Sequence, residues 1–163
     1  MVGRWAYYAE GKGAGLDVKN TVRINTPEGL QAEDALRYGM ENTHLYFNNL
    51  NIEAHVLQQL PEIPFYDSRR SARRLAHGQA TASAIKASAQ VSRTAVEARQ
   101  ASAMAALDGM AIINMWDAVC DAQTCSALRG DASWYFDNNH IVNQAARALA
   151  PRFAPLFKQA ASP

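Results

Sequence analysis

The spacing of apolar positions along the chain predicts strands that alternate with helices. Residues 2–9 are apolar and aromatic with a single charge, which is typical of a strand. An imperfect apolar stripe over residues 31–50 predicts a helix. Partial alternation over residues 51–60, ended by a proline, predicts a second strand. We expect a further helix over residues 91–108 and a short buried strand over residues 110–116.

The last third of the chain adds a cysteine-bounded loop, an aromatic segment that we interpret as ending the last strand, and a final helix. One face of that helix carries apolar side chains at i, i+3, i+4 and i+7, namely Val142, Ala145, Ala146 and Leu149. The resulting order predicts an α/β fold with a parallel sheet. Three core strands are few for such a sheet, and the first has almost no residues ahead of it. We therefore expect the chain to be a piece of a longer protein.

Composition and charge exclude several classes of protein. The chain has 163 residues, 48% of them hydrophobic and 19% charged, which is typical of one globular domain. Sixteen Lys and Arg against fifteen Asp and Glu leave a net charge of +1, so no basic footprint indicates nucleic-acid binding. The sequence contains neither a membrane-spanning apolar run nor the apolar core of a signal peptide.

Two features of the side-chain inventory bear on ligands. Two cysteines and the scattered histidines His44, His55 and His77 do not form a zinc motif, so we expect no metal and no cofactor. Four arginines cluster within residues 67–76. They are explained either by an anion-binding surface or by a solvated helix face.

The segment from Asp137 to His140 carries the strongest candidate chemistry. A carboxylate three residues before a histidine can orient the imidazole, which then serves as general base to a serine hydroxyl. We expect the segment to lie at the carboxyl end of the last strand, where open α/β sheets bind ligands. Two alternatives remain open: Asp137 caps the following helix, or the spacing is a coincidence.

Four segments, taken together, point to one family. In chain order, the first is GRW at residues 3–5, followed by Tyr8, and the second is PEIPF at residues 61–65. The third is the cysteine-bounded loop at residues 120–125, and the fourth is WYFDNNH at residues 134–140, which an Ala-rich helix follows. In this order they resemble the C-terminal part of SGNH (GDSL-like) hydrolase domains, specifically those of membrane-bound O-acyltransferases of the O-antigen acetylase type. The resemblance spans residues 3–146.

The resemblance implies a fold and a set of roles. The fold would be a partial flavodoxin-like, three-layer α/β fold that lacks its first strands and keeps strands three, four and five of the order 2-1-3-4-5. Asp137 and His140 would be the acid and base of a Ser-His-Asp triad. Arg4 and Trp5 would lie where the family has a substrate or oxyanion-hole residue, although ordinary core packing explains Trp5 equally well. Cys120 and Cys125 would form a disulfide, which suits an extracytoplasmic domain.

The chain also departs from the family pattern. The family's nucleophile lies in a Gly-Asp-Ser motif after its first strand, and these 163 residues contain no such motif. The glycine-bearing oxyanion block is missing as well. The Leu-Ser that follows the family's histidine is replaced by Ile141 and Val142. We therefore expect the chain to be inactive alone, with the nucleophile and most of the oxyanion hole outside it.

Two functions follow as expectations. In the first, the chain is the C-terminal segment of an O-acyltransferase or esterase that acts on cell-surface polysaccharide hydroxyls. A membrane acyltransferase domain in the same polypeptide would deliver the acyl group at the periplasmic or extracytoplasmic face of the membrane. In the second, the chain is a stand-alone, non-catalytic module that binds a glycan or a protein partner. Loss of the first strands would also expose an edge of the third strand, which predicts self-association.

Overall fold

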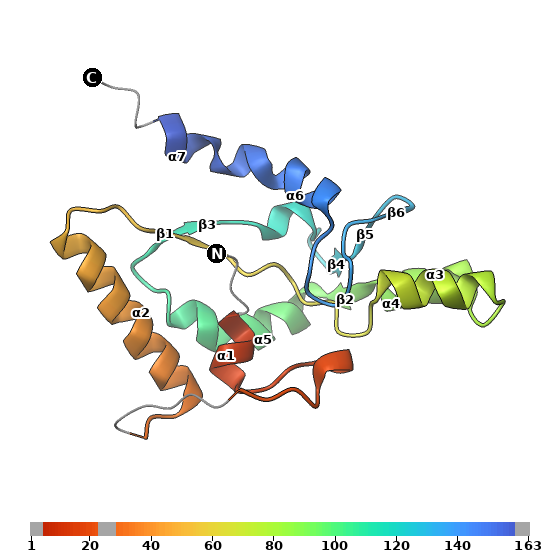
Figure 1. Cartoon of the computed structure of the whole chain (residues 1–163), viewed down its shortest axis with the longest axis horizontal. Coiled ribbons are helices and arrows are strands. Elements are labelled where there is room, and N and C mark those ends of the chain that lie inside the picture. The colour runs from red at the N-terminus through yellow and green to blue at the C-terminus, as the bar shows by residue number, and fades with distance from the viewer. Residues whose placement is uncertain (1–4, 23–28, 159–163) are drawn as a thin grey trace. The chain divides into compact units, whose positions relative to one another are not determined.

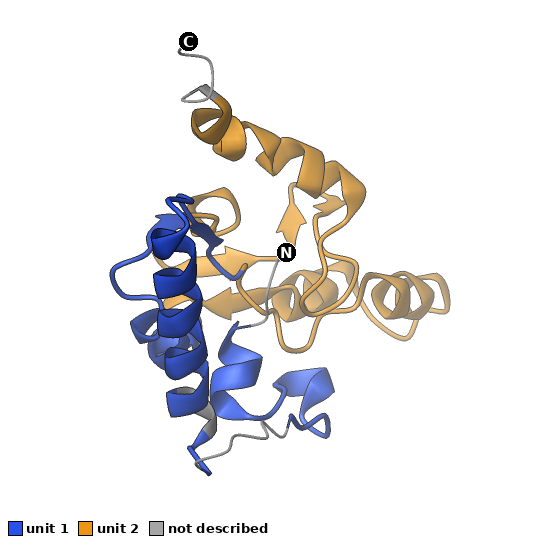
Figure 2. Cartoon of the chain, turned by 60° about the vertical axis from the view of Figure 1, so that its left-hand side comes forward, with its two compact units in different colours: residues 1–59, 95–113 blue, residues 60–94, 114–163 orange. Residues whose placement is uncertain are grey.

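The computed structural model describes residues 5–22 and 29–158. The chain divides into two compact units, each built from two stretches of sequence. Unit 1 comprises residues 1–59 and 95–113, and unit 2 comprises residues 60–94 and 114–163 (Figure 2). Asp137 and His140 both belong to unit 2, so the local structure of that unit decides their geometry.

Unit 1 contains the parallel strand pair. Its elements are α1 (Trp5–Glu10), a 3-10 helix (Gly15–Asp17), α2 (Ala32–Asn49), β1 (His55–Leu57), most of α5 (Arg93–Ala105) and β3 (Ala111–Ile113) (Figure 1). β1 and β3 pair in parallel, with Val56 opposite Ile112. Parallel pairing requires a long crossover, and here more than fifty residues separate the two strands. Helices together with a small parallel sheet agree with the predicted α/β class. The third core strand, expected to end in the aromatic segment at residues 134–136, is wrong, because these residues belong to no strand and the parallel pairing is that of β1 and β3.

The predictions for the helices and for the middle strand agree with the structure in kind. The helix expected over residues 31–50 is α2, and the helix expected over 91–108 is α5, which begins two residues later because Val91 belongs to β2 (Gln90–Ser92). The strand expected over 51–60 is confirmed only at His55–Leu57.

The strand predicted at residues 2–9 is wrong over its described part. The chain is helical from Trp5 to Glu10, and residues 2–4 lie outside the described structure. The buried positions are Ala6 and Ala9, three residues apart, which is the spacing of a helix face rather than of a strand. The helix α1 also packs against α2. The strand edge on which the expected self-association rested is therefore absent from residues 5–10.

The strand predicted as buried at residues 110–116 is shorter and more exposed than expected. β3 covers only Ala111–Ile113, and Ile112 remains 39% exposed. Within the described residues β3 pairs only with β1, so its other edge has no strand partner. The buried side chains follow the strand instead: Met115 and Trp116 lie at the start of a 3-10 helix (Trp116–Ala118).

Unit 2 is built from short elements joined by loops. They are α3 (Ser68–Ala76), α4 (Ala82–Ser88), β2, the 3-10 helix at Trp116–Ala118, β4 (Thr124–Ser126), β5 (Leu128–Arg129), β6 (Ala132–Ser133), α6 (Asn143–Leu149), a second 3-10 helix (Ala150–Phe153) and α7 (Ala154–Lys158). β2 pairs antiparallel with β4, and β5 with β6. The β5–β6 hairpin turns at Gly130, whose positive φ of 62° suits a two-residue loop.

Side-chain caps explain where the two helices of the α3–α4 segment begin. The carboxylate of Asp67 accepts a 2.7 Å hydrogen bond from the backbone N–H of Arg70, and the hydroxyl of Thr81 accepts one from Ala84. Each cap satisfies a backbone donor that the first helical turn leaves unpaired. Across the described residues, none of the helices combines the length and the apolar character needed to cross a membrane.

Candidate functional site

The carboxylate of Asp137 closes a tight turn on itself. Its Oδ1 atom accepts hydrogen bonds from the backbone N–H groups of Asn139, at 3.0 Å, and of His140, at 2.8 Å. The turn does not run directly into a helix, because α6 begins only at Asn143 and Val142 occupies its N-cap position. Asp137 therefore orders the loop that carries His140 and is not the cap of the last helix.

The same carboxylate holds the ring of His140. The Nδ1 atom of His140 lies 2.8 Å from Oδ2 and 3.0 Å from Oδ1 of Asp137. A carboxylate only accepts hydrogen bonds, so Nδ1 carries a proton and the neutral ring has its lone pair on Nε2. The His140 side chain is 72% exposed and that of Asp137 only 26% exposed. A sheltered carboxylate and an outward imidazole are the arrangement that a general base requires.

Opposing effects act on the pKa of Asp137. Burial raises it, because desolvation disfavours the charged carboxylate. Hydrogen bonds from the N–H groups of Asn139 and His140 and from the His140 ring outweigh burial and hold the pKa of Asp137 below its ordinary value. Asp137 is therefore ionised at neutral pH, and its carboxylate accepts the hydrogen bonds of the turn and of the His140 ring.

The loop that carries the pair is anchored to the PEIP turn, more than seventy residues earlier in the chain. The phenol of Tyr135 donates a 2.8 Å hydrogen bond to the carbonyl oxygen of Pro61. The N–H of Ile63 donates to the carbonyl oxygen of Asn138, also at 2.8 Å. Two of the segments that carry the family resemblance, residues 61–65 and 134–140, are therefore in direct contact.

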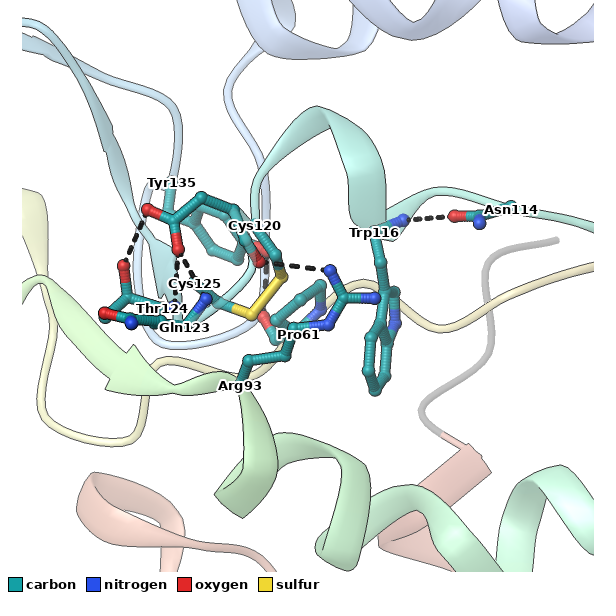
Figure 3. Close-up of a disulfide and its surroundings, with 10 residues drawn as sticks. Pro61, Arg93, Asn114, Trp116, Cys120, Gln123, Thr124, Cys125 and Tyr135 are labelled. Carbon is teal, nitrogen blue, oxygen red and sulfur yellow. Dashed lines mark hydrogen bonds between the residues drawn. A yellow bond between two sulfur atoms is a disulfide. The ribbon is translucent and has the colours of Figure 1, made fainter.

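A disulfide joins Cys120 and Cys125 in the neighbouring loop (Figure 3). Cys125 is fully buried in β4, opposite Val91 of β2. Between the cysteines, Asp121 Oδ1 accepts from the N–H groups of Gln123 and Thr124, and these bonds lower the pKa of Asp121. The conformation of this loop is thus fixed by the disulfide and by the hydrogen bonds of the Asp121 carboxylate.

The guanidinium of Arg93 joins this loop to the start of α5. It donates a 3.0 Å hydrogen bond to the carbonyl oxygen of Asp121 and lies 5.9 Å from the ring centroid of Trp116 (Figure 3). The N–H of Trp116 in turn donates to the side-chain oxygen of Asn114 at 2.8 Å. Arg93 therefore acts as a structural cation in this part of unit 2.

The structure describes only one of the two N-terminal candidates. Arg4 lies outside the described residues. Trp5 belongs to unit 1, where its indole Nε1–H donates a 3.1 Å hydrogen bond to the carbonyl oxygen of Leu57 in β1. This contact fastens α1 to the end of β1, which agrees with a packing role for Trp5.

The hydroxyls of two serines in unit 2, Ser68 and Ser133, are engaged in structural contacts. Ser133 Oγ lies 2.7 Å from the phenol oxygen of Tyr66, and Ser68 Oγ donates a 2.7 Å hydrogen bond to the carbonyl oxygen of Phe136. Neither residue lies in a nucleophile-elbow sequence. The described part of unit 2 thus holds a histidine whose ring is bound by a carboxylate, and the hydroxyls of these two serines contact other residues of unit 2.

Sequence reasoning missed two buried polar residues beside the pair. Asn138 is 4% exposed, and its carbonyl group anchors the loop to Ile63. Glu62 is 3% exposed. Burial of the Tyr135 phenol is the main cause that raises its pKa, and the negative charge of Glu62 is the second cause. The position of Glu62 between two prolines indicated a turn but contained no sign of burial.

No metal centre accompanies the pair in the described structure. Across residues 5–22 and 29–158, no three His, Cys, Asp or Glu side chains gather in a way that could hold a metal ion.

Comparison with known proteins adds one finding. The family model of the SGNH domain (fused to AT3 domains) matches residues 1–155, which is nearly the whole chain. The searches of curated proteins and of solved structures gave no match.

Proposed function

Because the chain belongs to the family of SGNH domains that are fused to AT3 domains, we propose that it is the C-terminal segment of an O-acyltransferase or esterase. Its substrates would be hydroxyl groups of cell-surface polysaccharides. An AT3 acyltransferase domain would deliver the acyl group, and the reaction would take place at the periplasmic or extracytoplasmic face of the membrane. The observation that carries this proposal is the bond between His140 Nδ1 and the Asp137 carboxylate at 2.8 Å.

The pair would move a proton twice in each cycle. First, His140 Nε2 takes the proton of a serine hydroxyl while the serine oxygen attacks the carbonyl carbon of the acyl donor. The donor's leaving group departs with that proton. Then a sugar hydroxyl gives its proton to His140 as its oxygen attacks the acyl-serine, and the serine oxygen leaves with the proton. Asp137 holds the imidazole in place and stabilises its charged form at both steps.

The serine and most of the oxyanion hole would come from outside these residues. The printed sequence has no Gly-Asp-Ser motif, and the hydroxyls of Ser68 and Ser133 are engaged in supporting contacts. A histidine and an aspartate alone cannot carry an acyl group as a serine ester does. The proposal therefore requires a serine from a segment that precedes this one.

The test has two stages. The DNA upstream of the Met1 codon is sequenced first, and we expect an open frame with a Gly-Asp-Ser motif after an apolar strand. Polysaccharide O-acylation is then measured in cells that carry the encoded protein or its Asp137→Asn and His140→Ala variants. Each variant should lower acylation at least about a hundredfold.

Matched controls guard against a general loss of structure. Asp131→Asn and His77→Ala change the same residue types at exposed positions in unit 2, and we expect acylation within about twofold of the wild type. A stop codon close upstream, or unchanged acylation in both site variants, would overturn the proposal. The chain would then be better described as a non-catalytic module that binds a glycan or a partner.

A further inference from the structure

The arginine cluster noted in the sequence forms one face of α3. In an α-helix the four arginines, Arg69, Arg70, Arg73 and Arg74, lie within about 140° of one another around the axis. All four are exposed, and the helix contains no acidic residue. We call this surface the α3 arginine face. It concentrates a quarter of the chain's sixteen cationic side chains in six residues, although the whole chain carries a net charge of only +1.

The charges of the α3 arginine face are not neutralised within the described residues. None of the four guanidinium groups forms an ion pair with a carboxylate of residues 5–22 or 29–158. Asp67 is close in sequence, but its carboxylate caps the backbone of α3 at Arg70. Arg69 and Arg70 also place positive charge in the first helical turn, where the helix dipole disfavours it.

Like charges also face each other along the helix. Arg69 and Arg73, and likewise Arg70 and Arg74, are four residues apart, so their side chains are neighbours on the surface. Repulsion between them makes the helix less stable when no anion is present. An anionic ligand that neutralises several of these charges at once would remove this repulsion.

The face adjoins the loop that carries Asp137 and His140. The N–H of Ser68, the first residue of α3, donates a 3.0 Å hydrogen bond to the carbonyl oxygen of Phe136, the residue before Asp137. The guanidinium carbon of Arg69 lies 4.5 Å from the centroid of the Phe136 ring. A ligand bound along α3 can therefore continue toward the pair.

Exposed aromatic rings accompany the arginines. Phe136 is 39% exposed, and Phe65, which lies between the backbone contacts of Ile63 and Ser68 to the same loop, is 70% exposed. Aromatic faces next to guanidinium groups suit a chain of sugar rings that carry acidic groups. The aromatic side chains offer apolar surface to the faces of the sugar rings, and the guanidinium groups bind the carboxylates or phosphates of the glycan bidentately.

We propose that the α3 arginine face binds an anionic polysaccharide and directs it to the Asp137–His140 pair. This inference rests on the proposed function and narrows its acceptor to glycans that carry carboxylate or phosphate groups. The arginines would act as positioning residues, because they contact the acceptor along its length and not its reacting hydroxyl.

The experiment measures binding and needs no catalytic activity. The 163-residue chain is titrated with polygalacturonate, with neutral dextran of similar length, and with vesicles of phosphatidylcholine and phosphatidylglycerol. We expect salt-sensitive binding to polygalacturonate and none to dextran. The double variant Arg70→Gln/Arg73→Gln should bind about tenfold more weakly. Arg70→Lys/Arg73→Lys keeps the charge but loses the bidentate geometry, so its affinity should lie between those of the wild type and the glutamine variant.

A matched variant removes the same charge elsewhere. Arg37→Gln/Arg147→Gln lowers the net charge by two at exposed positions outside α3, and we expect polygalacturonate binding within about twofold of the wild type. Equal losses in both glutamine variants, no binding above dextran, or tighter binding to vesicles than to polygalacturonate would each overturn the inference. These outcomes leave the acylation test of Asp137 and His140 unaffected, so the two proposals can fail separately.

Discussion

The phenol of Tyr135 donates a 2.8 Å hydrogen bond to the carbonyl oxygen of Pro61, and both residues are fully buried. This bond joins a turn with two prolines to the loop that presents Asp137 and His140. The hydrogen bond from the N–H of Ile63 to the carbonyl oxygen of Asn138 repeats the connection three residues further along the loop. The position of the pair therefore depends on contacts that bridge more than seventy residues of sequence.

Removing the phenol should loosen this connection. Tyr135→Phe leaves the buried Pro61 carbonyl without its donor, so we expect the free energy of unfolding to fall by about 1–3 kcal/mol. Chemical denaturation followed by circular dichroism measures the change. Tyr38→Phe alters an exposed phenol in α2 and serves as the control. Equal stability of the Tyr135 variant and the wild type would show that the bond contributes nothing.

The Asp137 turn should make stability depend on acid. The pKa of Asp137 is lower in the folded state than its ordinary value of 3.8, so its contribution is present above that value and is lost as the pH falls through the folded pKa. We expect Asp137→Asn to be less stable than the wild type near neutral pH, and the difference to shrink below about pH 4. Denaturation midpoints across this range measure it. A difference independent of pH would contradict the assignment.

The disulfide should stabilise unit 2. Closing the six-residue loop between Cys120 and Cys125 contributes about 2 kcal/mol on the chain-entropy account, so replacing both cysteines by serine should lower the free energy of unfolding by that amount. Thiol titration provides an independent check. The native and the denatured chain should both react as if no thiol were present, whereas two reactive thiols would show that the bridge does not form in solution.

The ion pair between Arg99 and Glu10 should matter more than the one between Arg37 and Asp34. Arg99 and Glu10 are 18% and 26% exposed, and their contact ties α5 to the end of α1. We expect Glu10→Gln to lower the free energy of unfolding by about 1–3 kcal/mol, because a sheltered, charge-assisted hydrogen bond loses its charge. Asp34→Asn breaks the exposed pair and should have almost no effect. Similar changes in both variants would mean that burial does not strengthen the first pair.

Interactions between residues close in sequence were predictable. The three-residue spacing of Asp137 and His140 is short enough for one side chain to reach the other, and the structure places their atoms 2.8 Å apart. The helices at Ala32–Asn49 and Arg93–Ala105 also follow from their apolar spacing and composition. Such features depend on covalent geometry and on neighbours within one or two turns, which the sequence contains directly.

Burial and pairing were decided only by the tertiary structure. An apolar and aromatic run at Trp5–Glu10 suits a strand or a helix, and the tertiary structure makes it a helix that contacts α2 and buries Ala6 and Ala9. Glu62 and Asn138 are buried because distant segments cover them. The sequence by itself thus determined local helices and the Asp137–His140 spacing. Which surfaces are covered, and by which distant segment, depended on the fold, because burial is a property of neighbours in space and not of neighbours in sequence.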